Sequence, residues 1–150
     1  MPGTDRRTWI EHLSPAVCWQ LMASTPVGRV GVLHDGGPEI YPVNHVVDGH
    51  SIVFRTDPGG KLHALHRSPA VCFQVDAVDP ATETGWSVLL KGTGTEVADQ
   101  ASLERFAQLD LRYWELGPKE HWVRIVPFEV TGRRLWAAPA RTSVPGGGAG

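Results

Sequence analysis

Apolar residues near the start of the chain recur at helical spacing: Val17, Cys18, Leu21 and Met22. They follow Ser14-Pro15, an N-cap residue with proline at the first helical position, and the run stops at Thr25-Pro26. A proline disfavours helical backbone at the residue before it, so it is a natural stop. The pattern predicts a helix over 15–24.

After Gly28 the apolar positions alternate with polar ones, which is typical of half-buried strands. Asp35-Gly36-Gly37 and Asp48-Gly49 are hairpin turns, and Asp57-Pro58-Gly59-Gly60 breaks the strand pattern. Ile52 and Phe54 are expected on one face. The pattern predicts strands over 28–34, 39–47, 51–56, 70–76, 86–97 and 122–135, with short helices from Lys61 to before Ser68 and over 101–109. Short strands joined by tight turns favour a closed or nearly closed antiparallel barrel with helices at its ends.

The two termini do not share this pattern. Residues 1–12 are expected to form a loosely ordered lead-in. Residues 139–150 are rich in Pro, Gly and Ala and are expected to be a disordered tail, because they bury too little apolar surface to offset the entropy of ordering. One domain is therefore expected over 13–138.

Composition and charge narrow the class of protein. The chain has 150 residues, 41% of them hydrophobic, and a formal net charge of −2. This balance supports a globular core and argues against a nucleic-acid binder, which usually carries a basic excess. No apolar run is long enough for a membrane span, and the first 12 residues lack the apolar core of a signal peptide, so the expected location is the cytoplasm.

Cysteine and histidine give no strong metal or redox pattern. Cys18 and Cys72 lie far apart between apolar neighbours, and we expect two buried structural thiols. His63 and His66 are three residues apart on a predicted helix, but a zinc site needs further ligands nearby, so solvated helix-face histidines are expected.

The segment that carries chemistry is the junction after the strand 51–56. Arg55 and Thr56 end this strand, glycines follow, and Lys61 opens a helix. A helix N-terminus offers unpaired N–H groups and a favourable dipole to an anion. Arg55 can add a bidentate fork and Lys61 a point charge. The alternative is a plain turn with two solvated cations, since such turns are common in β proteins.

An ordered set of short motifs resembles the FMN-binding split barrels of the pyridoxamine 5'-phosphate oxidase-like family. The resemblance covers about residues 13–136 and is strongest to a small actinobacterial branch related to the nitroimidazole-resistance reductases. The motifs are Gly28-Arg29-Val30, Tyr41-Pro42-Val43-Asn44, Phe54-Arg55-Thr56, Lys61-Leu62, Val75-Asp76, Asp79-Pro80 and Thr84-Gly85-Trp86-Ser87-Val88. It implies a mainly β, antiparallel, Greek-key-like split barrel with short helices.

The resemblance also implies roles for single residues. Arg55, Thr56 and Lys61 match positions that hold the FMN phosphate. The strand segment Pro42, Val43 and Asn44 matches backbone that faces the flavin ring. Trp86 and Ser87 match a strand that completes the site in a homodimer, whose sites lie between subunits; a core aromatic is the alternative for Trp86.

Two further residues are candidates for the substrate pocket. His45 shares a strand face with Val43, so it can contact substrate or flavin; the alternative is a barrel histidine bonded to a backbone carbonyl. Trp122 is a candidate for shaping the pocket. No side chain stands out as catalytic, which fits a protein whose cofactor supplies the chemistry.

The function implied is an FMN-dependent oxidoreductase acting on a small organic acceptor or on oxygen. The arginine-bearing C-terminal segment with which true pyridoxamine phosphate oxidases grip their substrate has no clear match, so vitamin B6 oxidation is not implied. Two alternatives stay open on the same fold: a reductase that uses the actinobacterial deazaflavin cofactor, and a non-catalytic module that binds flavin or haem.

Overall fold

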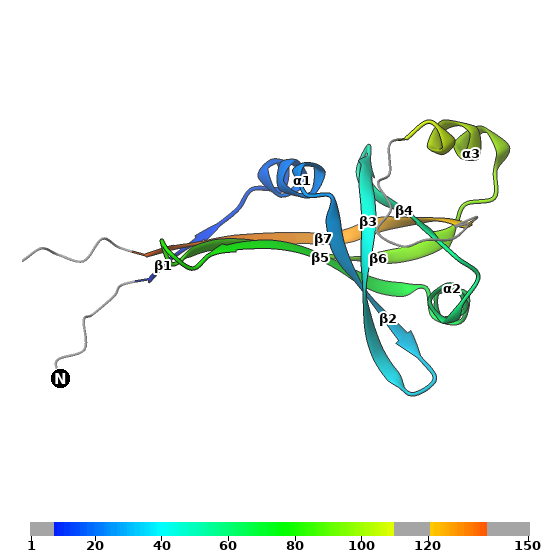
Figure 1. The fold of residues 1–150 in the computed structure, drawn as a ribbon, viewed down its shortest axis with the longest axis horizontal. Coiled ribbons are helices and arrows are strands. Elements are labelled where there is room, and N and C mark those ends of the chain that lie inside the picture. Colours follow the sequence, from blue (N-terminus) through cyan, green and yellow to red (C-terminus); the bar gives the residue numbers. More distant parts are fainter. Residues whose placement is uncertain (1–7, 110–120, 138–150) are drawn as a thin grey trace, which may run out of the picture.

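The structure is a computed structural model that describes residues 8–109 and 121–137. Figure 1 shows a strongly curved sheet with three short helices around it. The elements in chain order are β1 (Thr8–His12), α1 (Pro15–Ser24), β2 (Val27–His34), β3 (Gly37–Asp48), β4 (Ser51–Thr56), α2 (Gly60–Arg67), β5 (Ala70–Asp79), β6 (Thr84–Glu96), α3 (Gln100–Ala107) and β7 (His121–Ala137).

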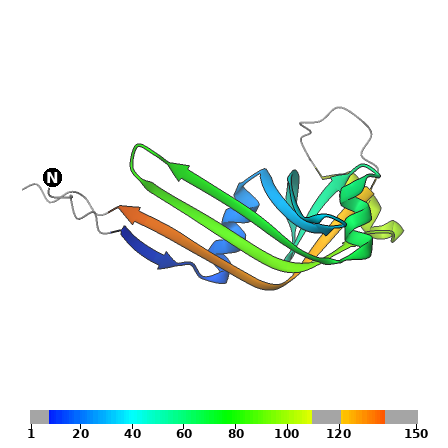
Figure 2. The ribbon, with the colours of Figure 1, turned by 90° about the horizontal axis from the view of Figure 1, so that it is seen from below.

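The strands of the described residues close into a ring. The order is β7-β4-β3-β2-β5-β6, and β6 pairs back onto β7, with every pairing antiparallel. Beyond the ring, β5, β6 and β7 continue side by side toward the end that carries β1 (Figure 2). The predicted antiparallel, mainly β barrel with short helices is confirmed.

The first helix begins and ends where the sequence predicts. The Ser14 side chain accepts a hydrogen bond from the Val17 N–H at 3.3 Å, and Pro15 occupies the first turn. Cys18 and Met22 of α1 are fully buried and pack into the core inside the ring.

Strand β4 is buried on both faces. Ile52 and Phe54 point into the ring, as the alternation predicts. On the other face, Val53 packs with Phe106 of α3 and Trp122 of β7 in a second, smaller cluster. Alternation along β4 alone does not predict this, because the cover comes from a helix about fifty residues later in the chain.

Two features differ from the sequence-based expectations. Residues 8–12, expected in a loose lead-in, form β1, which pairs with the end of β7 from Thr8–Ala137 to His12–Arg133. The prediction for Cys72 was wrong: Cys18 is buried but Cys72 is exposed. Val71 and Phe73 point inward on β5, so alternation turns Cys72 outward.

Residues 1–7, 110–120 and 138–150, the last of which include the predicted tail 139–150, lie outside the described residues. No helix in the described part of the chain is long and apolar enough to cross a membrane.

A β-bulge bends β7 where it crosses β6. Lys91 pairs with Glu129 and Gly92 with Pro127, so Phe128 has no partner on β6 and its side chain is 71% exposed. A Cβ atom on Gly92 would lie 2.3 Å from the carbonyl oxygen of Val126. Because that neighbour is backbone, only a shift of the strand can relieve the clash.

We therefore expect Gly92→Ala to lower the free energy of unfolding by about 1–3 kcal/mol, measured by chemical denaturation. Gly36→Ala is the matched control, since a Cβ there meets nothing within 4 Å and its φ is not in the left-handed region. Equal losses in the two variants would contradict this role of Gly92.

His45 of β3 connects the barrel to α1 through a hydrogen bond in the core. It is only 4% exposed, its Nε2 lies 2.9 Å from the carbonyl oxygen of Met22 in the last helical turn, and its ring packs edge-on against Phe73. Nδ1 is buried without a hydrogen-bond partner in the structure. The geometry is that of the carbonyl-bonded barrel histidine. Burial lowers the pKa of His45 below its ordinary value, because the core disfavours the charged ring.

This burial predicts an acid-sensitive fold. Because the pKa of His45 is lowered in the folded state, the unfolded chain binds a proton at this residue more readily than the folded chain does. The free energy of unfolding therefore falls as the pH drops below the unfolded-state pKa of about 6.5. The melting temperature should therefore decrease between pH 7 and pH 5, and it should decrease less in His45→Leu, whatever that variant loses at pH 7. A pH slope unchanged by the substitution would contradict the assignment.

Candidate functional site

The junction between β4 and α2 gathers the cationic candidates predicted from sequence. Arg55 and Thr56 end β4, and Lys61 lies in the first turn of α2. The N-cap residue of α2 is Gly59, and no side chain of the described residues caps this helix end. The first turn therefore presents main-chain N–H groups at the positive end of the helix dipole. This combination suits an anion.

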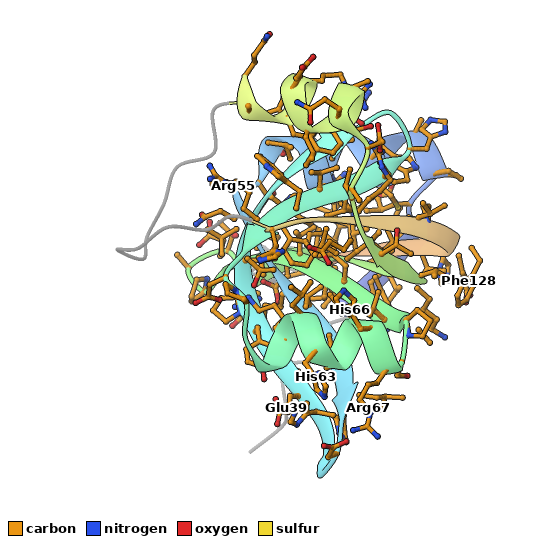
Figure 3. The ribbon with its side chains drawn as sticks, turned by 90° about the vertical axis from the view of Figure 1, so that its right-hand side faces the viewer. Glu39, Arg55, His63, His66, Arg67 and Phe128 are labelled. Atoms are coloured by element: carbon orange, nitrogen blue, oxygen red, sulfur yellow. The ribbon has the colours of Figure 1, made fainter. Side chains whose placement is uncertain are left out.

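The Arg55 side chain projects from the face of β4 that packs against α3. It pairs across the strands with Trp122 of β7, and the centre of its guanidinium lies 5.0 Å from the centroid of the indole ring. Figure 3 shows Arg55 on the side of the barrel opposite to Phe128. Trp122 is 6% exposed and packs against Phe106. Trp122, a candidate for the pocket wall, thus lies beneath Arg55.

Lys61 lies over aromatic rings on the other face of β4. Its Nζ is 5.2 Å from the ring centroid of Tyr41 and 5.9 Å from that of Phe54. The Tyr41 hydroxyl donates a hydrogen bond to Glu39, and this bond raises the pKa of the tyrosine. Both cations of the junction are thus held over aromatic faces, which attract positive charge through the ring quadrupole.

Thr56 differs from these two cations. Its side chain is fully buried, and its hydroxyl lies 3.3 Å from the carbonyl oxygen of Asp57. The side chain of Thr56 therefore helps to shape the turn, and only its position in the chain places it at the candidate anion site.

The strand segment Pro42–Asn44 borders the same junction. It pairs with β2 from Val27–Asn44 to Arg29–Pro42, but the register with β4 begins only at His45. The barrel opens here: β3 has a strand partner on one edge and none on the other within the described sheet. Pro42 is exposed, Asn44 is half-buried and Val43 points into the core.

Trp86 and Ser87 lie at the other end of the molecule. They pair with Arg134 and Arg133 near the end of β7, whereas Thr56 pairs with His121 at its beginning. Twelve residues of extended strand span roughly 40 Å. One chain therefore does not bring Trp86 and Ser87 to the β4–α2 junction.

Trp86 packs partly against the core and partly lines a surface hollow of about 270 Å³. The other lining residues are Ala77, Val78, Asp79, Thr84, Gly85, Arg134 and Trp136. Arg134 lies over the Trp136 ring at 5.5 Å, and the indole N–H of Trp136 donates to Glu11 at 2.9 Å. One part of the Trp86 side chain thus lies against the core and another part lies at the surface.

A carboxylate bridge that sequence reasoning missed lies beside α2. Glu96 accepts hydrogen bonds from His121 and from His66, the latter at 2.9 Å. These bonds, chiefly that from His121, lower the pKa of Glu96. His66 is thus paired rather than simply solvated, and nothing in local spacing signals it because the three residues come from α2, β6 and β7. No group of three or more metal-ligating side chains suited to an ion occurs within 8–109 and 121–137.

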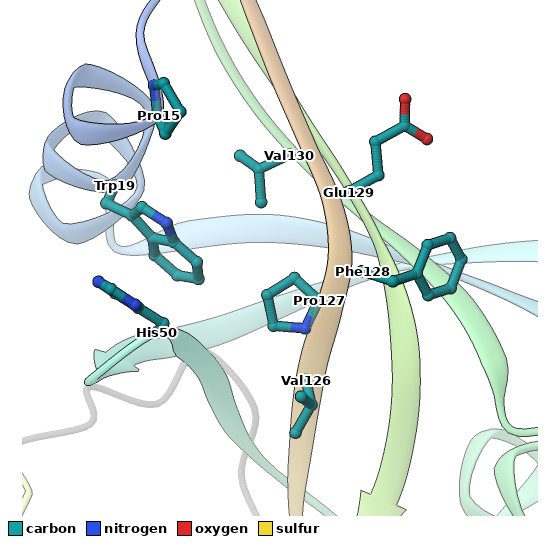
Figure 4. Close-up of a pocket in the computed structure, with 8 residues that line it drawn as sticks. All are labelled: Pro15, Trp19, His50, Val126, Pro127, Phe128, Glu129 and Val130. Atoms are coloured by element: carbon teal, nitrogen blue, oxygen red, sulfur yellow. The ribbon is translucent and has the colours of Figure 1, made fainter.

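A second hollow, of about 420 Å³, lies between α1 and the bulge of β7 (Figure 4). Trp19 and His50 stack there with their ring centroids 5.4 Å apart. Pro127 and Val130 lie across from them. Sequence spacing did not single out this place either.

Comparison with known proteins agrees with this architecture. Residues 14–134 match the family model described as pyridoxamine 5'-phosphate oxidase. The uncharacterized protein Rv0080 of Mycobacterium tuberculosis is 37% identical over 128 residues, which cover 82% of this chain and 83% of the relative.

Two solved structures place the fold. An FAD binding protein of Mycobacterium smegmatis superposes with a TM-score of 0.68 at 36% identity, covering 83% of this chain and 97% of the other. A candidate 5-nitroimidazole antibiotic resistance protein of Bacteroides thetaiotaomicron gives a TM-score of 0.69 over 87% of this chain and 93% of the other; at 13% identity it supports the fold alone. The resemblance predicted from short motifs is confirmed: this chain belongs to the pyridoxamine 5'-phosphate oxidase family of split-barrel proteins.

Proposed function

We propose that this protein binds a flavin phosphate at the β4–α2 junction and works as an FMN-dependent oxidoreductase on a small organic acceptor or oxygen. The observation that carries the proposal is that Arg55 near the end of β4 and Lys61 in the first turn of α2 lie, along the chain, on either side of a helix N-terminus that lacks a side-chain cap. A phosphate accepts hydrogen bonds from main-chain N–H groups, and the two cations complement its charge.

The ring of the flavin would lie along Pro42–Asn44, where β3 lacks a partner on one edge. Here the main chain can approach a flat ligand without an intervening strand. When bound, the flavin supplies hydride or electron transfer, and the protein supplies position and electrostatics. No residue of the described chain is assigned a proton-transfer role.

Phosphate anchoring does not by itself choose among flavins. FMN is our proposal, and FAD carries the same ribityl phosphate; the Mycobacterium smegmatis relative is described as an FAD binding protein. That description also favours a second candidate, a flavin-binding module without turnover. A deazaflavin cofactor is the third. Competitive titration of the three cofactors separates the ligands, and reduction of an acceptor by the loaded protein separates enzyme from carrier.

We further propose that the site is completed by a second copy of the chain. Trp86 and Ser87 can share a ligand with Arg55 only from another subunit, because the two places are too far apart within one chain. The surface near Trp86 supports such an interface: Trp9 and Val78 are 63% and 73% exposed there, and Trp136 is 44% exposed. Exposed apolar groups of this size are typical of interaction surfaces.

The charge of the junction gives a direct prediction. Lys61→Gln and Arg55→Gln should each weaken FMN binding about tenfold or more, since hydrogen bonds to charged groups contribute about 1.5–3 kcal/mol. Quenching of flavin fluorescence measures the dissociation constant. Lys91→Gln is the matched control, because Lys91 lies on β6 and pairs with Glu129. If the control weakens binding as much as Lys61→Gln does, the phosphate lies elsewhere.

Mixed dimers test the shared site. Co-expressed chains carrying Arg55→Gln and Trp86→Ala should form heterodimers with one intact and one doubly altered site. Each heterodimer should bind flavin with wild-type affinity at its one intact site, up to half of the amount that a wild-type dimer binds. Each variant homodimer should bind flavin weakly at both sites. Wild-type binding by a monomer, or heterodimers no better than the homodimers, would contradict a site built from two chains.

A further inference from the structure

We propose that Trp122 is a positioning residue that holds the Arg55 guanidinium for the flavin phosphate and thereby sets the preference for phosphorylated over unphosphorylated flavin. The inference rests on the proposed function and deepens it. It also replaces the sequence-based interpretation of Trp122 as a pocket wall, because the indole is 6% exposed and offers little surface to a substrate.

The contact between the two residues is built into the sheet. Arg55 and Trp122 are direct cross-strand partners of β4 and β7, and the guanidinium lies 5.0 Å from the ring centroid. Cross-strand partners project from the same face at close spacing, which brings the indole under the guanidinium. A guanidinium that lies over an indole face is attracted by the ring quadrupole, and its N–H groups can form a fork to a phosphate.

The indole itself cannot shift easily. Its ring packs against Phe106 with centroids 5.4 Å apart, and Phe106 is fully buried. Arg124 and Arg105 lie over Phe106 at 5.1 and 5.2 Å, and both bond to the same Asp48 oxygen at 2.9 Å. This chain of contacts fastens α3 to the β3–β4 turn and fixes the surface on which Arg55 rests.

Such a support lowers the cost of binding. An arginine side chain has many rotamers, and restricting them before the ligand binds leaves less entropy to lose on binding.

Lys61, the other cation of the junction, lies instead over Tyr41 and Phe54 on the opposite face of β4. A change at Trp122 therefore acts on one of the two cations, and it acts on the phosphate rather than on the flavin ring.

The test compares FMN with riboflavin, which lacks the phosphate. Trp122→Leu should raise the dissociation constant for FMN by about three- to thirtyfold, the range of cation–π contacts, and that for riboflavin by less than about twofold. Trp122→Phe keeps an aromatic face and should lose less. In an Arg55→Gln background, Trp122→Leu should cause no further loss of FMN affinity. Phe128→Leu removes an aromatic ring on the opposite side of the barrel and should leave the FMN-to-riboflavin ratio unchanged.

The outcomes separate this inference from the proposed function. Equal losses for FMN and riboflavin in Trp122→Leu, or an undiminished loss in the Arg55→Gln background, would overturn the positioning role while flavin binding stands. An unchanged ratio in both Trp122 variants would overturn it as well. A wild-type protein that binds neither flavin would remove the proposed function and the inference together. Circular dichroism at the assay temperature ensures that only folded variants are compared.

Discussion

Strand β7 pairs with three other strands, and the arrangement of the candidate site follows from these pairings. Its first residues pair with β4 and set Trp122 beside Arg55. Its middle crosses β6 at the bulge and closes the ring. Its last residues pair with β1 on one edge and with Trp86 and Ser87 of β6 on the other. One strand thus fixes both ends of the proposed site and the distance between them, which is why a site that uses both ends requires two chains.

Local sequence patterns were sufficient for most of the fold. The α1 bounds follow from Ser14-Pro15 and Thr25-Pro26, and the β4 bounds from the turns on either side. Long-range pairing was not visible. The five residues of β1 are too few for their pattern to predict a strand, because the pairing with β7 is not visible in the sequence. Cys72 shows a different failure, because apolar neighbours were given more weight than the alternation that turns the residue outward.

The candidate site shows the same division between local and distant information. The glycine turn and the two cations lie close together in the chain, so the β4–α2 junction could be named as a candidate anion site from the sequence alone. The indole under Arg55 belongs to β7 and packs on α3, far along the chain, so local patterns could not show that Trp122 contacts Arg55. Similarly, His45 shares a strand face with Val43 as predicted, but that face is the core, where its partner is a carbonyl of α1. Alternation gives the face of a residue, and only the packed elements decide what that face meets.

The most direct measurement is a crystal structure of the protein grown with FMN. We expect the phosphate within hydrogen-bond distance of Arg55, Lys61 and the first turn of α2, with the flavin ring along Pro42–Asn44 and the far side of the site closed by Trp86 of the partner subunit. A flavin bound instead in the hollow between Trp19, His50 and Pro127, or one held entirely by a single chain, would contradict this expectation.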